Sequence, residues 1–290
     1  MNDWLKAGKL AAQAREYAQE VCVAGKSYTY IVDTVEDFII KRGGFPAFPM
    51  DISVNHVAAH YCPFIDDPEE NIVKKGDVIK LDIGVHINGA VADNACTVEI
   101  GTNKWAKLIR ASKEACLAAC DLATPGRPIY QLGAIVEDTI RSHGFNPITN
   151  LSGHGVGLWQ VHTAPAIPNY DNGNKKTLVE GQYIAIEPFA TDGIGSVSEG
   201  KPCGVYGFLQ KKPVRLPGAR KLMGHIEKTY NTLPFTERWL KDTPNIKFLL
   251  ALLEREGVIK QYTILPEKKN GMVTQHENTI EIGTGITTKI

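Results

Sequence analysis

Five ionisable residues lie in short, mostly apolar segments of the sequence, where charged side chains are normally excluded. They are four carboxylates and one imidazole: Asp82, Asp93, His154, Glu187 and Glu277. An isolated ionised carboxylate is costly to bury, so buried carboxylates are usually paired with a cation or bound to a metal. Four carboxylates balance the charge of two divalent cations. A set of oxygen ligands with a single imidazole suits a hydrolytic site with two metal ions.

The two aspartates lie in a segment, residues 78–98, that the sequence predicts to be a β-hairpin. Apolar and polar residues alternate before Asn88-Gly89, and this dipeptide is the strongest short signal for a hairpin turn. With the turn placed there, Asp82 and Asp93 become diagonal neighbours on one face of the sheet. Diagonal neighbours lie about 7–8 Å apart, close enough for two side chains to share ions. Gly84 is expected to face Asp93 and to leave room opposite it.

The other three candidate ligands come from separate segments. His154 lies in a glycine-rich stretch, residues 151–157, where the backbone can approach other groups closely. Glu187 ends an apolar strand-like run, and Glu277 lies among alternating apolar residues near the C-terminus. His276 neighbours Glu277 but is expected to point to the opposite face of its strand. Each segment alone is weak evidence, and it is their combination that favours a metal site.

The chain also contains a weak internal repeat at a fixed offset of 101 residues, the separation of Trp4 from Trp105. The tripeptide at residues 35–37 recurs at residues 136–138. Each copy has the pattern of two amphipathic helices separated by a glycine, followed by strand-like segments. We interpret the repeat as two similar halves around a pseudo-twofold axis, with a site between them.

Length and composition limit which other classes of function the chain could have. A chain of 290 residues forms one large domain or two smaller ones. The formal net charge is +0 and no long basic run is present, which gives nucleic-acid binding little electrostatic support. The longest apolar run, about residues 248–253, is too short to span a bilayer, and the N-terminus lacks the apolar stretch of a signal peptide. Six scattered cysteines without a CxxC pair fit a reduced cytoplasmic location.

The ordered set of five candidate ligands resembles the metal ligands of the methionine aminopeptidases, which belong to the pita-bread metallohydrolases. Residues 48–55 and 58–61 are similar to the substrate-site segment of the type II enzymes, and residues 185–193 are also type II-like. No long extension precedes the similar region, so the chain resembles the short archaeal form. It departs from the usual pattern at three positions near the expected site: Asp51, His276 and Asn278.

The resemblance implies an α+β pita-bread fold, in which a pseudo-twofold antiparallel sheet is flanked by helices. It assigns residues 1–202 and 266–290 to the catalytic domain and residues 203–265 to a small helical, winged-helix-like insertion. Apolar spacing and prolines predict three short helices in this insertion: 217–232, 235–241 and 243–257. Its basic residues leave a nucleic-acid role open, but acidic residues offset them. A surface position beside the active-site cleft is the preferred interpretation.

The implied activity is metal-dependent removal of the N-terminal methionine from nascent proteins and peptides, with a preference for a small second residue. A hydroxide activated by two divalent ions of Co, Mn, Fe or Zn would attack the peptide. Asp82 would bind one ion, His154 and Glu187 the other, and Asp93 and Glu277 both. Glu187 would also carry a proton to the leaving amine.

Four further residues receive roles from the same resemblance. His60 is expected to contact the scissile amide nitrogen, and His162 to stabilise the oxyanion. Phe48 and Pro49 are expected to line the pocket for the methionine side chain, and these two residues and the two histidines form the expected substrate-binding set. The expected partners are nascent polypeptide N-termini, with transient contact to the ribosome. No membrane and no specific nucleic acid are expected, and the chain is expected to be a monomer.

Two alternative functions remain open from the sequence. An Xaa-Pro dipeptidase or aminopeptidase would keep the fold and the metals, but the segment around Phe48 and Pro49 argues against it. A catalytically silent relative that binds ribosomes or RNA would belong to another class of protein. Such relatives lose metal ligands, whereas all five are present here.

Overall fold

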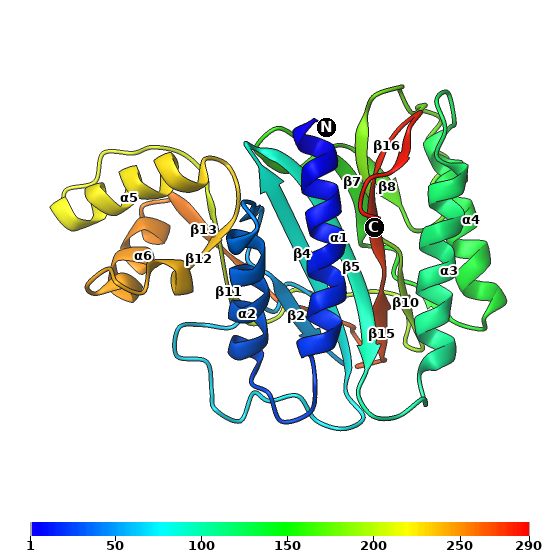
Figure 1. Cartoon of the computed structure of the whole chain (residues 1–290), viewed down its shortest axis with the longest axis horizontal. Coiled ribbons are helices and arrows are strands. Elements are labelled where there is room, and N and C mark those ends of the chain that lie inside the picture. The colour runs from blue at the N-terminus through cyan, green and yellow to red at the C-terminus, as the bar shows by residue number, and fades with distance from the viewer. Residues whose placement is uncertain (1, 290) are drawn as a thin grey trace.

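The computed structural model describes residues 2–289, which form two similar halves and an insertion (Figure 1). The first half consists of α1 (Asp3–Val21), α2 (Tyr28–Lys41), β1 (Phe45–Pro46), β2 (Asp51–Val54), β3 (Val57–Ala59), β4 (Val78–Ile87) and β5 (Ala90–Glu99). The second half consists of α3 (Ala106–Leu122), α4 (Ile129–Ser142), β6 (Asn146–Pro147), β7 (Ser152–Gly157), β8 (Gln160–Pro168), β9 (Tyr183–Ile186) and β10 (Phe189–Thr191). After the insertion, the chain returns through β14 (Leu265–Pro266), β15 (Val273–Gln275), β16 (Glu277–Glu281) and β17 (Gly285–Ile286).

The internal repeat is confirmed at the level of elements. Helix α4 and strand β6 begin and end 101 residues after α2 and β1, the offset that the sequence predicted. The glycines that separate the helices of each half, Gly25 and Gly126, have similar left-handed φ angles of 88° and 79°. Only glycine adopts this conformation without steric cost, so the same turn is built in both halves.

A curved antiparallel sheet brings the two halves together. Its strand order is β1-β4-β5-β16-β9-β7-β8, with β2 paired to β4 and β17 to β16. Strand β16 therefore lies between the strands of the first half and those of the second. Figure 1 shows α1 in front of β4 and β5, and α3 and α4 beside β16. The insertion is at the left of this view, beyond α2.

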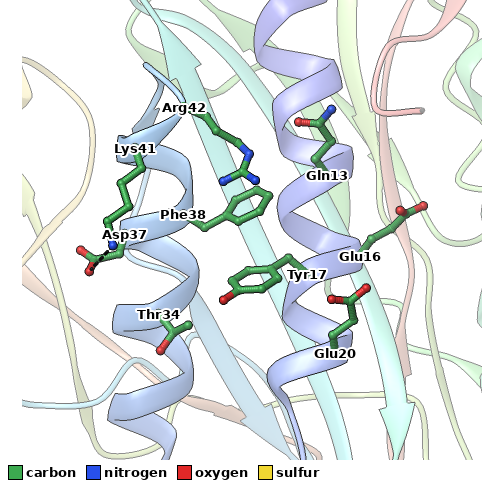
Figure 2. A pocket seen from close by; sticks show the side chains of 9 residues that line it. All are labelled: Gln13, Glu16, Tyr17, Glu20, Thr34, Asp37, Phe38, Lys41 and Arg42. Atoms are coloured by element: carbon green, nitrogen blue, oxygen red, sulfur yellow. Dashed lines mark ion pairs between the residues drawn. The ribbon is translucent and has the colours of Figure 1, made fainter.

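Small side chains let α1 lie close to the sheet. Its inward face consists of fully buried alanines that include Ala7, Ala11 and Ala14, and Asn2 caps its N-terminus by accepting from the Leu5 N–H. Figure 2 shows the open groove between α1 and α2, which is lined by aromatic and charged side chains. In it, the rings of Tyr17 and Phe38 stack at 4.5 Å.

The insertion has its own small sheet and apolar core. It contains β11 (Pro202–Phe208), α5 (Pro217–Tyr230), β12 (Phe235–Thr236), the 3₁₀ helix η1 (Glu237–Leu240), α6 (Ile246–Arg255) and β13 (Ile259–Thr263), with strand order β12-β11-β13. The helices expected at 217–232 and 243–257 are present in shortened form as α5 and α6. The helix expected at 235–241 is instead a strand followed by one 3₁₀ turn, because Phe235 and Thr236 pair with β11.

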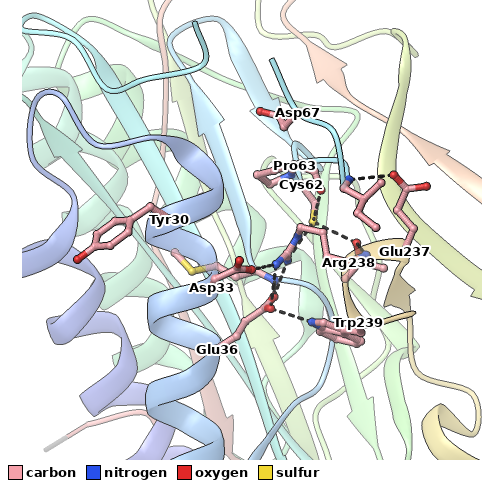
Figure 3. Close-up of polar contacts among 12 residues, drawn as sticks. Tyr30, Asp33, Glu36, Cys62, Pro63, Asp67, Glu237, Arg238 and Trp239 are labelled. Atoms are coloured by element: carbon pink, nitrogen blue, oxygen red, sulfur yellow. Dashed lines mark hydrogen bonds and ion pairs between the residues drawn. The ribbon is translucent and has the colours of Figure 1, made fainter. Parts of the chain in front are cut away.

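A buried polar network attaches the insertion to α2 (Figure 3). The guanidinium of Arg238, in η1, lies 3.0 Å from a carboxylate oxygen of Glu36 and also pairs with Asp33. The indole N–H of Trp239 donates to the same Glu36 carboxylate at 2.8 Å. Glu36 in turn accepts from the backbone N–H of Met50. The network therefore connects the insertion with the segment that leads into β2.

Two further expectations concern the chain as a whole. No helix within residues 2–289 is both long and apolar enough to cross a membrane. All six cysteines are free thiols in the interior of the protein. Cys116 and Cys120 lie on the buried face of α3 among alanines, where they pack as small apolar residues.

Candidate metal centre

The β4–β5 hairpin positions two of the five candidate ligands as the sequence predicted. Asp82 pairs with Ala95 and Asp93 pairs with Gly84, so the two aspartates lie on one face of the sheet as diagonal neighbours. The room opposite Asp93 is not empty, which corrects one expectation. The ring of Phe48 fills it, and a Cβ on Gly84 would lie 2.2 Å from Phe48 Cε1.

Substitution of Gly84 by alanine is expected to lower the free energy of unfolding by about 1–3 kcal/mol, because the aromatic ring must move out of a packed position. Thermal unfolding measures the change. Gly224→Ala is the matched control, since nothing lies within 4 Å of its added Cβ on α5. That change should leave stability unchanged or raise it by up to about 1 kcal/mol, because alanine favours the helix. Equal stability of G84A and the parent would contradict the packing described here.

Adjacent strands bring the other three ligands to the same place. His154 is on β7, Glu187 follows β9 directly, and Glu277 begins β16. The His154 Nε2 atom lies 3.5 Å from a carboxylate oxygen of Glu187, 3.7 Å from one of Asp93 and 4.0 Å from one of Glu277. Since β16 lies between β5 and β9, these residues converge from both halves of the chain.

Burial dominates the electrostatics of this cluster. It raises the pKa of Asp93, Glu187 and Glu277 well above the usual carboxylate range, and the neighbouring carboxylates raise these pKa values further. Burial also raises the pKa of Asp82 to about 6. The pKa of His154 falls to about 3 because burial disfavours the imidazolium. The cluster thus presents a neutral imidazole to several carboxyl groups that have no cationic partner in the described part of the chain.

The donor set fits divalent cations. Among the described residues, one buried carboxylate oxygen each of Asp82, Asp93 and Glu277 has no hydrogen-bond partner. One ligand atom each from Asp93, His154 and Glu277 falls within a mutual distance of 4.8 Å. The His154 Nδ1 atom lies 3.1 Å from the Gly155 carbonyl oxygen, which assigns the proton to Nδ1 and leaves the Nε2 lone pair toward the carboxylates. This is the tautomer that a metal ligand requires.

His60 and His162, the other two candidate histidines, line the same pocket as the cluster. The ring of His162 packs edge-on against that of His154, with centroids 4.3 Å apart. His60 has a left-handed φ of 69°, and its ring Nδ1 lies 3.3 Å from the Thr263 carbonyl oxygen. Burial lowers the pKa of His60 to about 4, so its ring is neutral near pH 7.

All nine residues that the sequence singled out as site residues line one pocket, which has a volume of about 70 Å³. Sequence reasoning missed several others. Val205 and Tyr262 come from the strands of the insertion, and Tyr262 packs edge-on against His60 with centroids 5.8 Å apart. Gln275, two residues before Glu277, donates to Asp82 at 2.9 Å. No signal in the sequence pointed to Val205 or Tyr262, because only the folded insertion brings them to the pocket.

Asp51 also lines the pocket, although it was noted in the sequence only as a departure from the usual pattern. It pairs with Asp82 across β2 and β4, and one of its carboxylate oxygens accepts the His60 N–H at 2.9 Å. Its other oxygen is buried without a partner among the described residues. Burial and the neighbouring Asp82 raise the pKa of Asp51 well above the usual range. Asp51 thus fixes the backbone of His60 in its unusual conformation.

Comparison with known proteins places this geometry in a family. The model of metallopeptidase family M24 matches residues 3–230. A methionine aminopeptidase of Archaeoglobus fulgidus is 43% identical over 288 residues, which cover 98% of this chain and 97% of that protein.

Two solved structures bear on the fold. The structure of methionine aminopeptidase from Rickettsia prowazekii gives a TM-score of 0.72 at 20% identity and covers 99% of this chain and 95% of that chain. A thermophilic Arx1 gives a TM-score of 0.84 at 19% identity, with 97% and 89% covered. These likenesses confirm the α+β pita-bread fold.

The family match and the donor set agree. A metallopeptidase of this family requires divalent metal, and the buried carboxylates and imidazole described above are suitable ligands. The similarity to the Archaeoglobus protein extends over nearly the whole of both chains. The chain therefore belongs to metallopeptidase family M24, and within that family to the methionine aminopeptidases.

Proposed function

We propose that the protein removes the N-terminal methionine from nascent proteins and peptides, and prefers substrates with a small second residue. One observation carries the proposal: the five candidate ligand residues, from both halves of the chain, meet in one narrow pocket that Phe48, Pro49 and Tyr262 also line. An apolar, partly aromatic wall suits the flexible thioether of methionine.

The residues that would hold two divalent cations are Asp82, Asp93, His154, Glu187 and Glu277. Cations bound there would polarise the scissile carbonyl and lower the pKa of a water molecule. Co, Mn, Fe and Zn all suit this mixed donor set. The Nδ1–H contact of His154 to Gly155 holds its ring in the required orientation.

The remaining side chains supply proton transfer and positioning. Glu187 would take the proton of the attacking water on its carboxylate and pass it to the leaving amine. His162, which lines the pocket, would donate to the oxyanion that develops on the carbonyl. His60 would contact the scissile amide nitrogen. The hydrogen bond from its backbone to Asp51 keeps it there.

Replacement of His162 by alanine is expected to lower kcat by about 10²–10³-fold, because a donor to the transition state is lost. His60→Ala should also lower kcat/KM. Neither residue coordinates metal in this account, so metal content measured by atomic absorption should be unchanged. His225→Ala, on the exposed side of α5, is the control and should retain full activity. Loss of metal in parallel with loss of rate would contradict the assignment.

A substrate panel tests the proposed activity directly. The metal-loaded protein is given Met-Ala-Ser, Met-Lys-Ser and Ala-Pro peptides, and products are identified by mass spectrometry. We expect methionine to be released from Met-Ala-Ser and not from Met-Lys-Ser. Cleavage of Ala-Pro would instead make the protein an Xaa-Pro peptidase. No cleavage of any peptide would support the silent binding protein.

The insertion is proposed to be a subdomain, residues 203–265, attached to a catalytic domain of residues 1–202 and 266–290. The terminal residues 1 and 290 lie outside the described structure. Support comes from the separate apolar core of the insertion and from its boundaries, since β11 begins at Pro202 and β13 ends at Thr263. Because Val205 and Tyr262 line the pocket, the insertion shapes the site. A monomeric state, a cytoplasmic location and transient ribosome contact stay predictions from the sequence.

A further inference from the structure

A second cavity, of about 290 Å³, lies between α1 and α3 on the other face of the sheet from the candidate metal centre. It is lined by Asn278 on β16 and by His276, the residue before β16, whereas Glu277 between them lines the pocket of the metal centre. This alternation is the one expected along a strand. His276 is held by Ser112 of α3, whose Oγ lies 2.9 Å from Nδ1. The cavity is therefore separated from the peptide pocket by one layer of sheet.

The lining of this cavity is rich in cations. Arg15 of α1, Lys113 of α3 and Lys289 near the C-terminus contribute positive charge, and among residues 2–289 Glu16 is the single carboxylate of the lining. Within residues 2–289, no carboxylate oxygen lies within 4.0 Å of a side-chain nitrogen of these three cations. Figure 2 shows Glu16 directed away from α2, on the side of α1 that faces this cavity. The positive charges thus outnumber the negative one.

The guanidinium of Arg15 is fixed before any ligand arrives. It donates to the Glu277 carbonyl oxygen at 3.1 Å, to Asn278 Oδ1 at 3.0 Å and to the Thr288 carbonyl oxygen at 3.1 Å. These contacts use three of the five N–H groups that a guanidinium carries, so two remain for a ligand. A fixed, partly buried guanidinium with free donors is well suited to bind carboxylate or phosphate oxygens.

The shape and the remaining lining indicate the size of the ligand. The volume of the cavity, about 290 Å³, lies just below the usual range for small-molecule sites, which begins at about 300 Å³. Leu117 and Ile286 add an apolar wall beside the charged groups. We propose that this cavity binds a small organic anion, whose phosphate or carboxylate group contacts Arg15, Lys113 and Lys289 and whose apolar part packs against that wall. The proposal is independent of the peptidase activity.

Isothermal titration calorimetry on the metal-loaded full chain tests the proposal with three probes: inorganic phosphate, glycerol 3-phosphate and succinate. We expect at least one to bind with a Kd below about 1 mM in 0.15 M KCl, where weak surface attraction is screened. The first two probes together indicate a phosphate ligand, and succinate indicates a carboxylate. If none of the three probes gives binding heat at concentrations up to about 10 mM, the cavity has no useful affinity for anions. That result would overturn the proposal.

Three variants test whether the anion binds in this cavity. Lys113→Ala and Lys289→Ala should each weaken binding about fivefold, because each removes one nearby charge. Glu16→Gln should strengthen binding about fivefold, because it removes a nearby negative charge. A substitution that only destabilised the fold would not strengthen binding. Lys228→Ala, on the exposed side of the distant α5, removes the same charge and should leave Kd unchanged. Anions also bind at metal ions. If none of the four substitutions changes Kd, the anion binds at the metal centre and not in this cavity, and the proposal is overturned.

Discussion

Asp93→Asn is expected to abolish peptidase activity and to make the metal-free protein more stable. One carboxylate oxygen of Asp93 lies 3.7 Å from His154 Nε2, and the other has no hydrogen-bond partner among the described residues. Loss of a metal ligand should reduce kcat/KM by at least about 10³-fold, since the metal supplies several kcal/mol of transition-state stabilisation. In the metal-free protein, the carboxylate is buried beside other carboxylates, so its neutralisation should stabilise the fold by about 1–4 kcal/mol.

Thermal unfolding with and without metal measures both parts of this prediction. The parent should gain stability when metal is added, because metal binds only the folded state. Metal-free D93N should unfold at a higher temperature than the metal-free parent, and added metal should raise its unfolding temperature only slightly. Asp121→Asn, on the exposed side of α3, is the matched control and should behave as the parent does. A D93N protein that unfolds at a lower temperature than the metal-free parent would show that repulsion among the carboxylates is unimportant.

Arg238→Met is the second substitution with a large expected effect, a loss of about 3–5 kcal/mol in the free energy of unfolding. Methionine keeps much of the volume of the side chain but leaves the buried carboxylate of Glu36 without its cation (Figure 3). Chemical denaturation measures the loss. Glu36 also receives the Met50 N–H, so the peptide pocket should be disturbed and KM should rise.

A double-mutant cycle distinguishes the ion pair from simple packing. Arg238→Met combined with Glu36→Leu should be more stable than R238M alone, because no unpaired charge is then left in the interior. The exposed pair of Lys211 and Glu227 within the insertion is the comparison. Lys211→Met should change stability by less than about 1 kcal/mol, as is usual for surface ion pairs. Additive effects of the two buried substitutions would contradict the proposed coupling.

The parts of the fold that followed from the sequence are those with local signals. The Asn88-Gly89 turn fixed the hairpin register and thereby the relative positions of Asp82 and Asp93. The helix pairs of both halves followed from apolar spacing and from the repeat. The meeting of all five ligands did not follow from spacing alone, because it depends on β16 inserting between two strands far away in the sequence.

The parts that could not be predicted depend on long-range pairing. Strands β11 and β13 pair Tyr206 with Gln261 across two helices, and short strands of this kind leave little periodic signal. Their side chains nevertheless supply Val205 and Tyr262 to the peptide pocket. The filling of the space at Gly84 by Phe48 was equally invisible, since a glycine in a strand indicates close approach but not by which group.

The most direct test of the central claim is to titrate the metal-stripped protein with Mn²⁺ while measuring methionine release from Met-Ala-Ser and the bound metal in the same samples. The account predicts no release in the presence of a chelator, release that rises with bound metal, and anomalous diffraction peaks for Mn among the five ligand side chains in crystals of the active protein. Methionine release by the fully stripped protein, or metal bound away from these five residues in an active enzyme, would contradict it.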